Sequence, residues 1–148
     1  MLRSAILGCG PRAGAHAQAY RDLKGAALAA CCDTDRARLD KFAADFSVPA
    51  RFDDLGRMMR EVKPDLLHIV TPPTVRLKVL LPALERPPRA ILLEKPLANR
   101  PGEGYRVLEE CSRKGVALFL NHQLRFQPMW ERLRDTLRSG ILGRVLSV

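Results

Sequence analysis

A glutamate and a lysine follow directly on an apolar run near the middle of the chain. Residues 90–93 (AILL) lead into Glu94, Lys95 and Pro96. Such a short apolar run predicts a buried strand, and in an open α/β sheet ligands bind beyond the carboxyl ends of the strands. Lys95 is therefore a candidate for contact with a substrate. Taken alone, the three residues fit a solvent-exposed charged loop equally well.

The segment 8–14 (GCGPRAG) has the glycine spacing of a dinucleotide-binding loop. It follows a predicted strand and opens a predicted helix, which is the context that the G-x-G-x-x-G/A pattern requires. Gly8 permits a tight turn, Gly10 lets the backbone approach a pyrophosphate, and Ala13 allows the helix to pack closely on the strand. The backbone N–H groups at the start of the helix would then face the phosphates.

Asp33 ends the second predicted strand, nineteen positions after Gly14. An acid at this place hydrogen-bonds the ribose 2′-hydroxyl of a dinucleotide, which favours NAD. A carboxylate would repel the 2′-phosphate of NADP, although Arg36 or Arg38 could offset that repulsion, so NADP stays open. Asp33 could instead only cap the next helix, a role that Thr34 could also fill.

Short apolar runs alternate with helical patterns along the chain, which predicts a doubly wound parallel sheet in a three-layer α/β/α domain. The runs lack apolar/polar alternation, as expected for strands buried on both faces. Strands are predicted at 3–7, 27–32, 66–70, 90–93 and 116–120, with a short one at 50–52, and helices at 13–23, 34–46, 55–60, 74–84 and 102–114.

Several single residues refine this scheme. Thr34 and Asp53 are the expected helix caps, and Pro82 should kink or end its helix. Trp130, Leu133 and Leu137 recur at helical spacing, which predicts packing in the core. Residues 143–148 resemble the beginning of a further strand.

Two of the three histidines are not nominated for the site. His68 lies inside the apolar fourth run, where a structural core residue is expected, and His16 falls on the first predicted helix.

Composition restricts the classes of function. The 148 residues suffice for one domain, and no apolar stretch approaches the roughly 18 to 20 residues of a membrane span. Four cysteines without C-x-x-C or His/Cys spacing predict no metal site. The net charge is +9, but the basic residues are scattered along the chain and form no concentrated basic segment, so we expect no nucleic-acid partner. The N-terminus has no signal-peptide pattern, which predicts a cytoplasmic protein.

Methyltransferases that bind S-adenosylmethionine also combine a glycine loop with an acid after the second strand. Their fourth strand usually ends in acidic or aromatic residues. Here it ends in Thr71, Pro72 and Pro73, a rigid uncharged turn that suits contact with a flat ring. The sequence thus favours a dinucleotide over S-adenosylmethionine.

Five motifs together resemble the Gfo/Idh/MocA oxidoreductases: GCGPRAG at 8–14, CD at 32–33, TPP at 71–73, EKP at 94–96 and NHQLRFQP at 121–128. The likeness spans essentially the whole chain. It implies an N-terminal NAD(P)-binding Rossmann domain over residues 1–143, with residues 144–148 as the start of a C-terminal substrate domain. In this family the second domain commonly builds oligomers, so a homo-oligomer is expected of the full-length protein.

The resemblance also implies roles for single residues. Lys95 would contact the reacting hydroxyl of a sugar, cyclitol or related polyol, and Glu94 would fix the nicotinamide end of the cofactor. Asn121 and His122 would reach the substrate, although a structural hydrogen bond explains His122 equally well. The remaining cofactor contacts would come from Gly8, Gly10, Pro11, Arg12, Ala13, Asp33, Thr71, Pro72 and Arg125.

Two alternatives remain at this stage. Arg76 stands where the family often has a histidine, which leaves the contacts of that position open. A non-catalytic dinucleotide-binding sensor or partner-binding module, with Lys95 as a vestige, also fits the motifs. We expect residues 1–148 alone to bind NAD(H) weakly and to turn over little substrate, because half of the wall around the substrate is absent.

Overall fold

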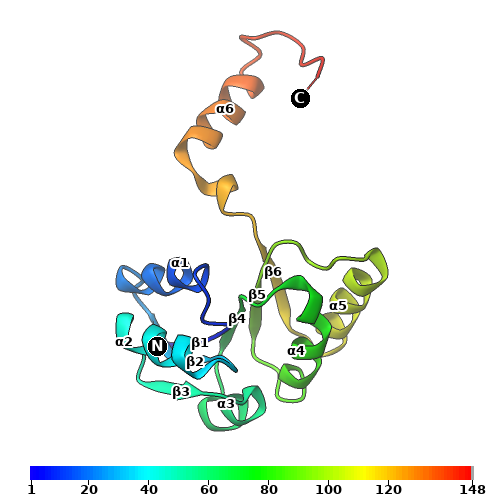
Figure 1. Ribbon diagram of the computed structural model, residues 1–148. Coiled ribbons are helices and arrows are strands. Elements are labelled where there is room, and N and C mark those ends of the chain that lie inside the picture. Colours follow the sequence, from blue (N-terminus) through cyan, green and yellow to red (C-terminus); the bar gives the residue numbers. More distant parts are fainter. Residues whose placement is uncertain (148) are drawn as a thin grey trace.

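The computed structural model describes residues 1–147 and contains a six-stranded, fully parallel sheet with helices on both faces (Figure 1). The strand order is β3-β2-β1-β4-β5-β6. The strands are β1 (Leu2–Leu7), β2 (Ala26–Cys32), β3 (Ala50–Phe52), β4 (Leu66–Ile69), β5 (Ala90–Glu94) and β6 (Ala117–Asn121). The helices are α1 (Ala13–Gln18), α2 (Arg36–Asp45), α3 (Leu55–Val62), α4 (Arg76–Ala83), α5 (Pro101–Arg113) and α6 (Pro128–Arg138). This order confirms the predicted doubly wound, Rossmann-like fold.

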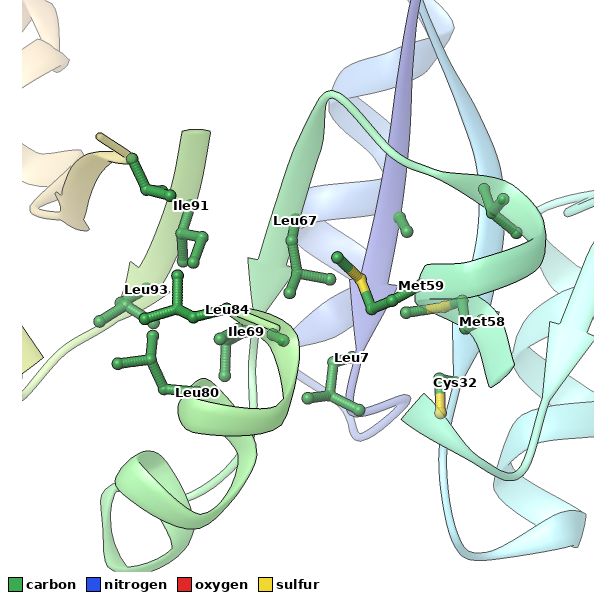
Figure 2. Packing of buried hydrophobic residues seen from close by; sticks show 14 of the residues in the cluster. Leu7, Cys32, Met58, Met59, Leu67, Ile69, Leu80, Leu84, Ile91 and Leu93 are labelled. Carbon is green, nitrogen blue, oxygen red and sulfur yellow. The ribbon is translucent and has the colours of Figure 1, made fainter. Parts of the chain in front are cut away.

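Two apolar clusters hold the three layers together. Side chains of α3, α4 and α5 pack on one face of the sheet, where Met59, Leu80 and Leu84 meet Leu67 and Leu93 (Figure 2). Helices α1 and α2 pack on the other face around Ile6 and Cys31. Neighbouring Cys31 and Cys32 belong to different clusters, as the alternation of side chains along a strand requires.

The strand order places the functional end of the sheet at β1 and β4. The chain winds outwards from β1 through β2 to β3, and then returns to the other side of β1 as β4. The loops that follow β1 and β4 therefore leave the sheet in opposite directions. A crevice opens between them at the carboxyl edge, which is where ligands bind in sheets of this kind.

The predicted helix caps are wrong by one residue. Asp35, not Thr34, caps α2 by accepting a hydrogen bond from the Arg38 amide at 3.0 Å. Asp54, not Asp53, caps α3 by accepting one from the Arg57 amide at 2.6 Å. In both cases the cap is the extended residue directly before the first helical one, which the sequence pattern did not locate. Pro82 does end its helix, since α4 stops at Ala83.

The predicted core role of the α6 stripe is also wrong. Trp130 is 42% exposed and Leu133 44% exposed, and Leu137 is only half-buried. Figure 1 shows α6 beyond the end of β6, away from the sheet, and among the described residues 1–147 none of α6 is buried. The stripe has helical periodicity but lacks a covering surface within this part of the chain.

The predicted final strand does not form over residues 143–147, and Val148 lies outside the described residues. Instead the chain turns after α6, where Gly140 and Gly143 both have positive φ. Within residues 1–147, no helix is both long enough and apolar enough to cross a bilayer.

Candidate active site

A cleft of about 910 Å³ lies at the carboxyl edge of the sheet. The loop after β1, the ends of β2 and β5 and the turn after β4 supply its walls, and α4 adds Val79 and Lys78. Four cations line it (Arg12, Arg38, Lys78 and Lys95), against two carboxylates (Asp33 and Glu94). The balance of charge is positive, which suits a ligand with two phosphates.

The glycine loop forms one wall. Gly8 has φ +93°, and a Cβ there would lie 3.1 Å from the backbone of Val70 and of Thr71, so this crossing of loops admits only glycine. At Gly10 a Cβ would meet no atom within 4 Å, and the backbone is open to the cleft. Among residues 1–147 the amides of Gly10 and Arg12 donate no hydrogen bond. Amides without an acceptor are available to an anionic ligand in the cleft, and the pyrophosphate contact stays a prediction.

Ala13 does not line the cleft. It is fully buried under α1, and its amide donates to the Gly10 carbonyl at 2.9 Å. The residue therefore serves the close helix packing expected of it rather than direct contact. Gly14 also serves this packing, because a Cβ at that position would lie only 3.3 Å from the Phe46 ring.

Asp33 is buried at the end of β2 and accepts four hydrogen bonds. The amides of Cys9 and Asp35 each donate at 2.8 Å, to Oδ2 and Oδ1 respectively. Arg38 adds Nη2 to Oδ1 at 3.0 Å and Nε to Oδ2 at 3.4 Å. Burial alone would raise the pKa of this carboxyl, but the bonds from Arg38, Asp35 and Cys9 outweigh burial and lower the pKa.

Glu94 is buried at the end of β5 and uses one oxygen for all its protein contacts. Its Oε1 accepts hydrogen bonds from Asn121 Nδ2 at 2.6 Å, His16 Nε2 at 2.8 Å and Arg12 Nε at 3.1 Å. Burial would raise the pKa of Glu94, but these three donors lower it. None of the hydrogen bonds within residues 1–147 uses Oε2, which leaves that atom for a ligand in the cleft.

Sequence reasoning missed the part that His16 plays. It is buried on α1 between Glu94 and His68, and its Nδ1 lies 2.9 Å from His68 Nδ1. Tyr20 Oη lies 2.6 Å from His68 Nε2. Two signals were present: His16 and Tyr20 are four residues apart on one helix, and a histidine inside an apolar strand needs a polar partner.

Lys95 is exposed at the rim of the cleft, next to Glu94. The Lys95–Pro96 peptide bond is cis. Arg76 is fully buried beneath this turn and donates to the carbonyls of Ile69 and Pro96, both at 3.3 Å. The position that departs from the family pattern therefore joins the ends of β4 and β5 instead of facing the cleft.

The segment after β6 only partly meets its predicted role. Asn121 is directed to Glu94, while His122 and Arg125 are exposed and outside the cleft lining. Gln123 is the residue of this segment that reaches the cleft. Thr71, Pro72, Pro11 and Arg12 do line it, as predicted. Lys78 is a cationic lining residue for which the sequence carried no motif.

Comparison with known proteins decides the family. A family model described as "Oxidoreductase family, NAD-binding Rossmann fold" (Gfo/Idh/MocA) matches residues 2–122. The chain belongs to this family. This match excludes the methyltransferase alternative. The family binds NAD.

Curated Gfo/Idh/MocA relatives align over nearly the whole chain. D-apiose dehydrogenase of Paraburkholderia graminis is 30% identical over 96% of this chain and 38% of its own length. Inositol 2-dehydrogenase 4 of Saccharopolyspora erythraea is 31% identical over 98% of this chain and 43% of its own. The chain thus spans about two-fifths of the length of these relatives.

Solved structures agree with the fold. An oxidoreductase from Agrobacterium radiobacter, crystallised with NAD+, L-tartaric acid and magnesium, superposes with a TM-score of 0.89 at 25% identity, over 97% of this chain and 42% of its own. The WlbA dehydrogenase of Bordetella pertussis, in complex with NADH and UDP-GlcNAcA, gives 0.86 at 26% identity, over 97% and 44%.

The Asp33 carboxyl should make the fold sensitive to acid. Its pKa is below the usual aspartate value of 3.8, so its ionised form stabilises the folded state above that pH, and this contribution is lost as pH falls through the lower pKa of the folded state. We expect Asp33→Asn to reduce the free energy of unfolding at pH 7 and to flatten its decline below about pH 4. Urea unfolding measured from pH 7 to pH 3 checks this.

Asp22→Asn is the control, since Asp22 is an exposed aspartate after the first helix. An Asp33→Asn variant with the same pH dependence of unfolding as this control would show that Asp33 is not held in its ionised form by the fold.

Proposed function

We propose that the chain is the cofactor-binding domain of an NAD(P)-dependent dehydrogenase or reductase that acts on a sugar, a cyclitol or a related polyol or carbonyl compound. The single observation that carries the proposal is the cleft in which two amides that donate no hydrogen bond within residues 1–147, the buried Asp33 carboxylate and the Glu94–Lys95 pair lie along one sheet edge. Relatives named as D-apiose and inositol 2-dehydrogenases support the substrate class.

The residues of the cleft divide the work in this proposal. The amides of Gly10 and Arg12 would hold the pyrophosphate, and Asp33 with Arg38 would receive the adenosine ribose. Glu94 Oε2 would orient the nicotinamide end. When bound, the cofactor supplies the hydride acceptor or donor.

Lys95 would act on the reacting oxygen. Lys95 lies at the rim next to Glu94, where an amine would accept the hydroxyl proton as the carbinol carbon is oxidised, or return it in the reduction. The protein's further contribution is to hold amine, carbon and ring in line. An ammonium also suits the place electrostatically, because the buried Glu94 carboxylate is its neighbour in the chain.

We propose further that residues 144–148 begin a C-terminal substrate domain and that the full-length protein forms a homo-oligomer. The exposed apolar residues Phe126, Trp130 and Leu133 support this, since they offer a surface for another domain or copy. We place the protein in the cytoplasm, in keeping with four buried cysteines that form no disulfide. Asn121, His122 and Arg125 remain proposed contacts to cofactor or substrate from the segment after β6.

Replacement of Lys95 by alanine tests the proposed chemistry. In the full-length protein, Lys95→Ala should lower kcat by about 10²- to 10⁴-fold, the usual contribution of a proton-transfer group, while the Kd for NADH stays within about twofold. Steady-state kinetics with polyol substrates and calorimetry with NADH measure the two effects.

The matched control is Lys114→Ala, an exposed lysine that precedes β6 at the opposite edge of the sheet. If Lys95→Ala and the control turn over substrate equally, Lys95 is not the proton-transfer group. If the wild-type protein binds NADH but turns over no polyol, the chain is better described as a non-catalytic dinucleotide sensor. The proposal also expects residues 1–148 alone to bind NADH weakly with little turnover.

Arg38 is proposed to admit NADP beside NAD. Both oxygens of Asp33 already accept two hydrogen bonds, one of each pair from Arg38, whose side chain is half exposed to the cleft. A 2′-phosphate would attract this guanidinium away from Asp33. Arg38→Ala should therefore weaken NADPH binding by about tenfold or more and leave NADH binding equal or tighter. Calorimetry with both cofactors measures this.

Arg36→Ala serves as the comparison, because Arg36 pairs with Asp40 and Asp53 and does not line the cleft. An equal loss of NADPH affinity in both variants, or none in Arg38→Ala, would reject this assignment.

A further inference from the structure

A line of buried polar side chains leads from Glu94 in the cleft to the half-exposed Tyr20 on the other side of α1. The successive contacts are Glu94 Oε1 to His16 Nε2 at 2.8 Å, His16 Nδ1 to His68 Nδ1 at 2.9 Å, and His68 Nε2 to Tyr20 Oη at 2.6 Å. They join β5, α1 and β4 with the turn that extends α1. Both rings are nearly inaccessible, at 6% exposure for His16 and 5% for His68.

Which atom donates in each of these hydrogen bonds follows from the groups at the two ends of the line, the Glu94 carboxylate and the Tyr20 hydroxyl. A carboxylate only accepts, so His16 must carry its proton on Nε2. The contact between the two Nδ1 atoms needs one donor and one acceptor. If His16 is neutral, its Nδ1 accepts and His68 Nδ1 donates. His68 Nε2 then has a lone pair, and the Tyr20 hydroxyl donates to it.

The alternative order requires a charge. If His16 were an imidazolium, it would donate from Nδ1 to His68, and His68 Nε2–H would donate to Tyr20 Oη. This order would bury a cation between Glu94 and the His68 ring. Two other donors already share the one carboxylate oxygen that faces His16, namely the Arg12 guanidinium on the loop before α1 and the neutral Asn121 amide of β6. Because Glu94 Oε1 already accepts hydrogen bonds from these two donors, it would compensate the charge of a buried imidazolium only weakly.

We propose that Tyr20 and His68 are positioning residues that hold His16 as the neutral Nε2–H tautomer, and that His16 thereby keeps Glu94 oriented with Oε1 towards the protein and Oε2 towards the cofactor. The hydrogen bond at one nitrogen of an imidazole fixes which nitrogen carries the proton. Three donors then occupy Oε1, and rotation of the carboxylate would forfeit all three. Burial lowers the pKa of His68, in accord with a neutral ring there.

The order of donors and acceptors in this line concerns the chain alone, whereas the role of Glu94 Oε2 rests on the proposed function. The experiment therefore measures the tautomers without cofactor first and cofactor affinity second.

The first measurement is a long-range proton–nitrogen NMR spectrum of the ¹⁵N-labelled chain at pH 7. We expect His16 to show a protonated Nε2 with a bare Nδ1, and His68 the reverse. The third histidine, His122, is exposed after β6 and provides a reference in the same spectrum. A doubly protonated His16, or His16 protonated on Nδ1 only, overturns the proposal whatever the variants do.

The second measurement uses Tyr20→Phe, which keeps the ring and removes the donor. His68 can then carry its proton on Nε2 and accept at Nδ1, so His16 should become a mixture of tautomers, and the affinity for NADH should fall by about three- to tenfold, the effect of losing one hydrogen bond between neutral groups. The only other tyrosine, Tyr105, is exposed on α5, and Tyr105→Phe should change neither readout.

The outcomes separate the two claims. If the wild-type chain binds no NADH, the proposed function fails, while the tautomers still decide the donor order. If Tyr20→Phe leaves both the His16 tautomer and the NADH affinity as in the wild type, the positioning role is wrong although the domain binds its cofactor.

Discussion

Two buried carboxylates, Asp33 and Glu94, must stay ionised at the carboxyl edge of the sheet, and much of the site follows from that requirement. Asp33 directly follows β2, and Glu94 is the last residue of β5. An unpaired buried charge is so costly that such groups occur only with several hydrogen bonds. Asp33 therefore receives two backbone amides and an arginine, and Glu94 receives an arginine, an imidazole and an amide. These donors come from the glycine loop, from α1 and α2, and from the end of β6.

The same bonds set the shape of the cleft. The Cys9 amide ties the glycine loop to Asp33, and the contact of Gly8 with the turn after β4 closes the loop from the other side. Arg12 reaches across the cleft mouth to Glu94. Beneath the floor, Arg76 links the carbonyls at the ends of β4 and β5. These hydrogen bonds thus connect the parts of the cleft that we propose to hold the phosphates, the ribose and the nicotinamide.

The sequence was sufficient for the features that local chemistry dictates. The strand positions, the glycine loop, Asp33 and the Glu94–Lys95 pair all follow from runs and spacing within a few residues. It failed where a role depends on residues distant in the chain. His16, His68 and Tyr20 meet only because α1 crosses β4 and β5, and Arg76 turned inwards because two strand ends needed a donor. The α6 stripe failed differently, since periodicity shows that a helix has an apolar side but not what covers it.

The account depends on where the dinucleotide lies, and a crystal structure of the chain with NADH is its most direct test. We expect the pyrophosphate oxygens within hydrogen-bond distance of the Gly10 and Arg12 amides, the adenosine ribose at Asp33, and the nicotinamide between Glu94 Oε2 and Lys95 Nζ. A pyrophosphate bound away from the glycine loop, or a lysine amine directed away from the nicotinamide, would contradict it.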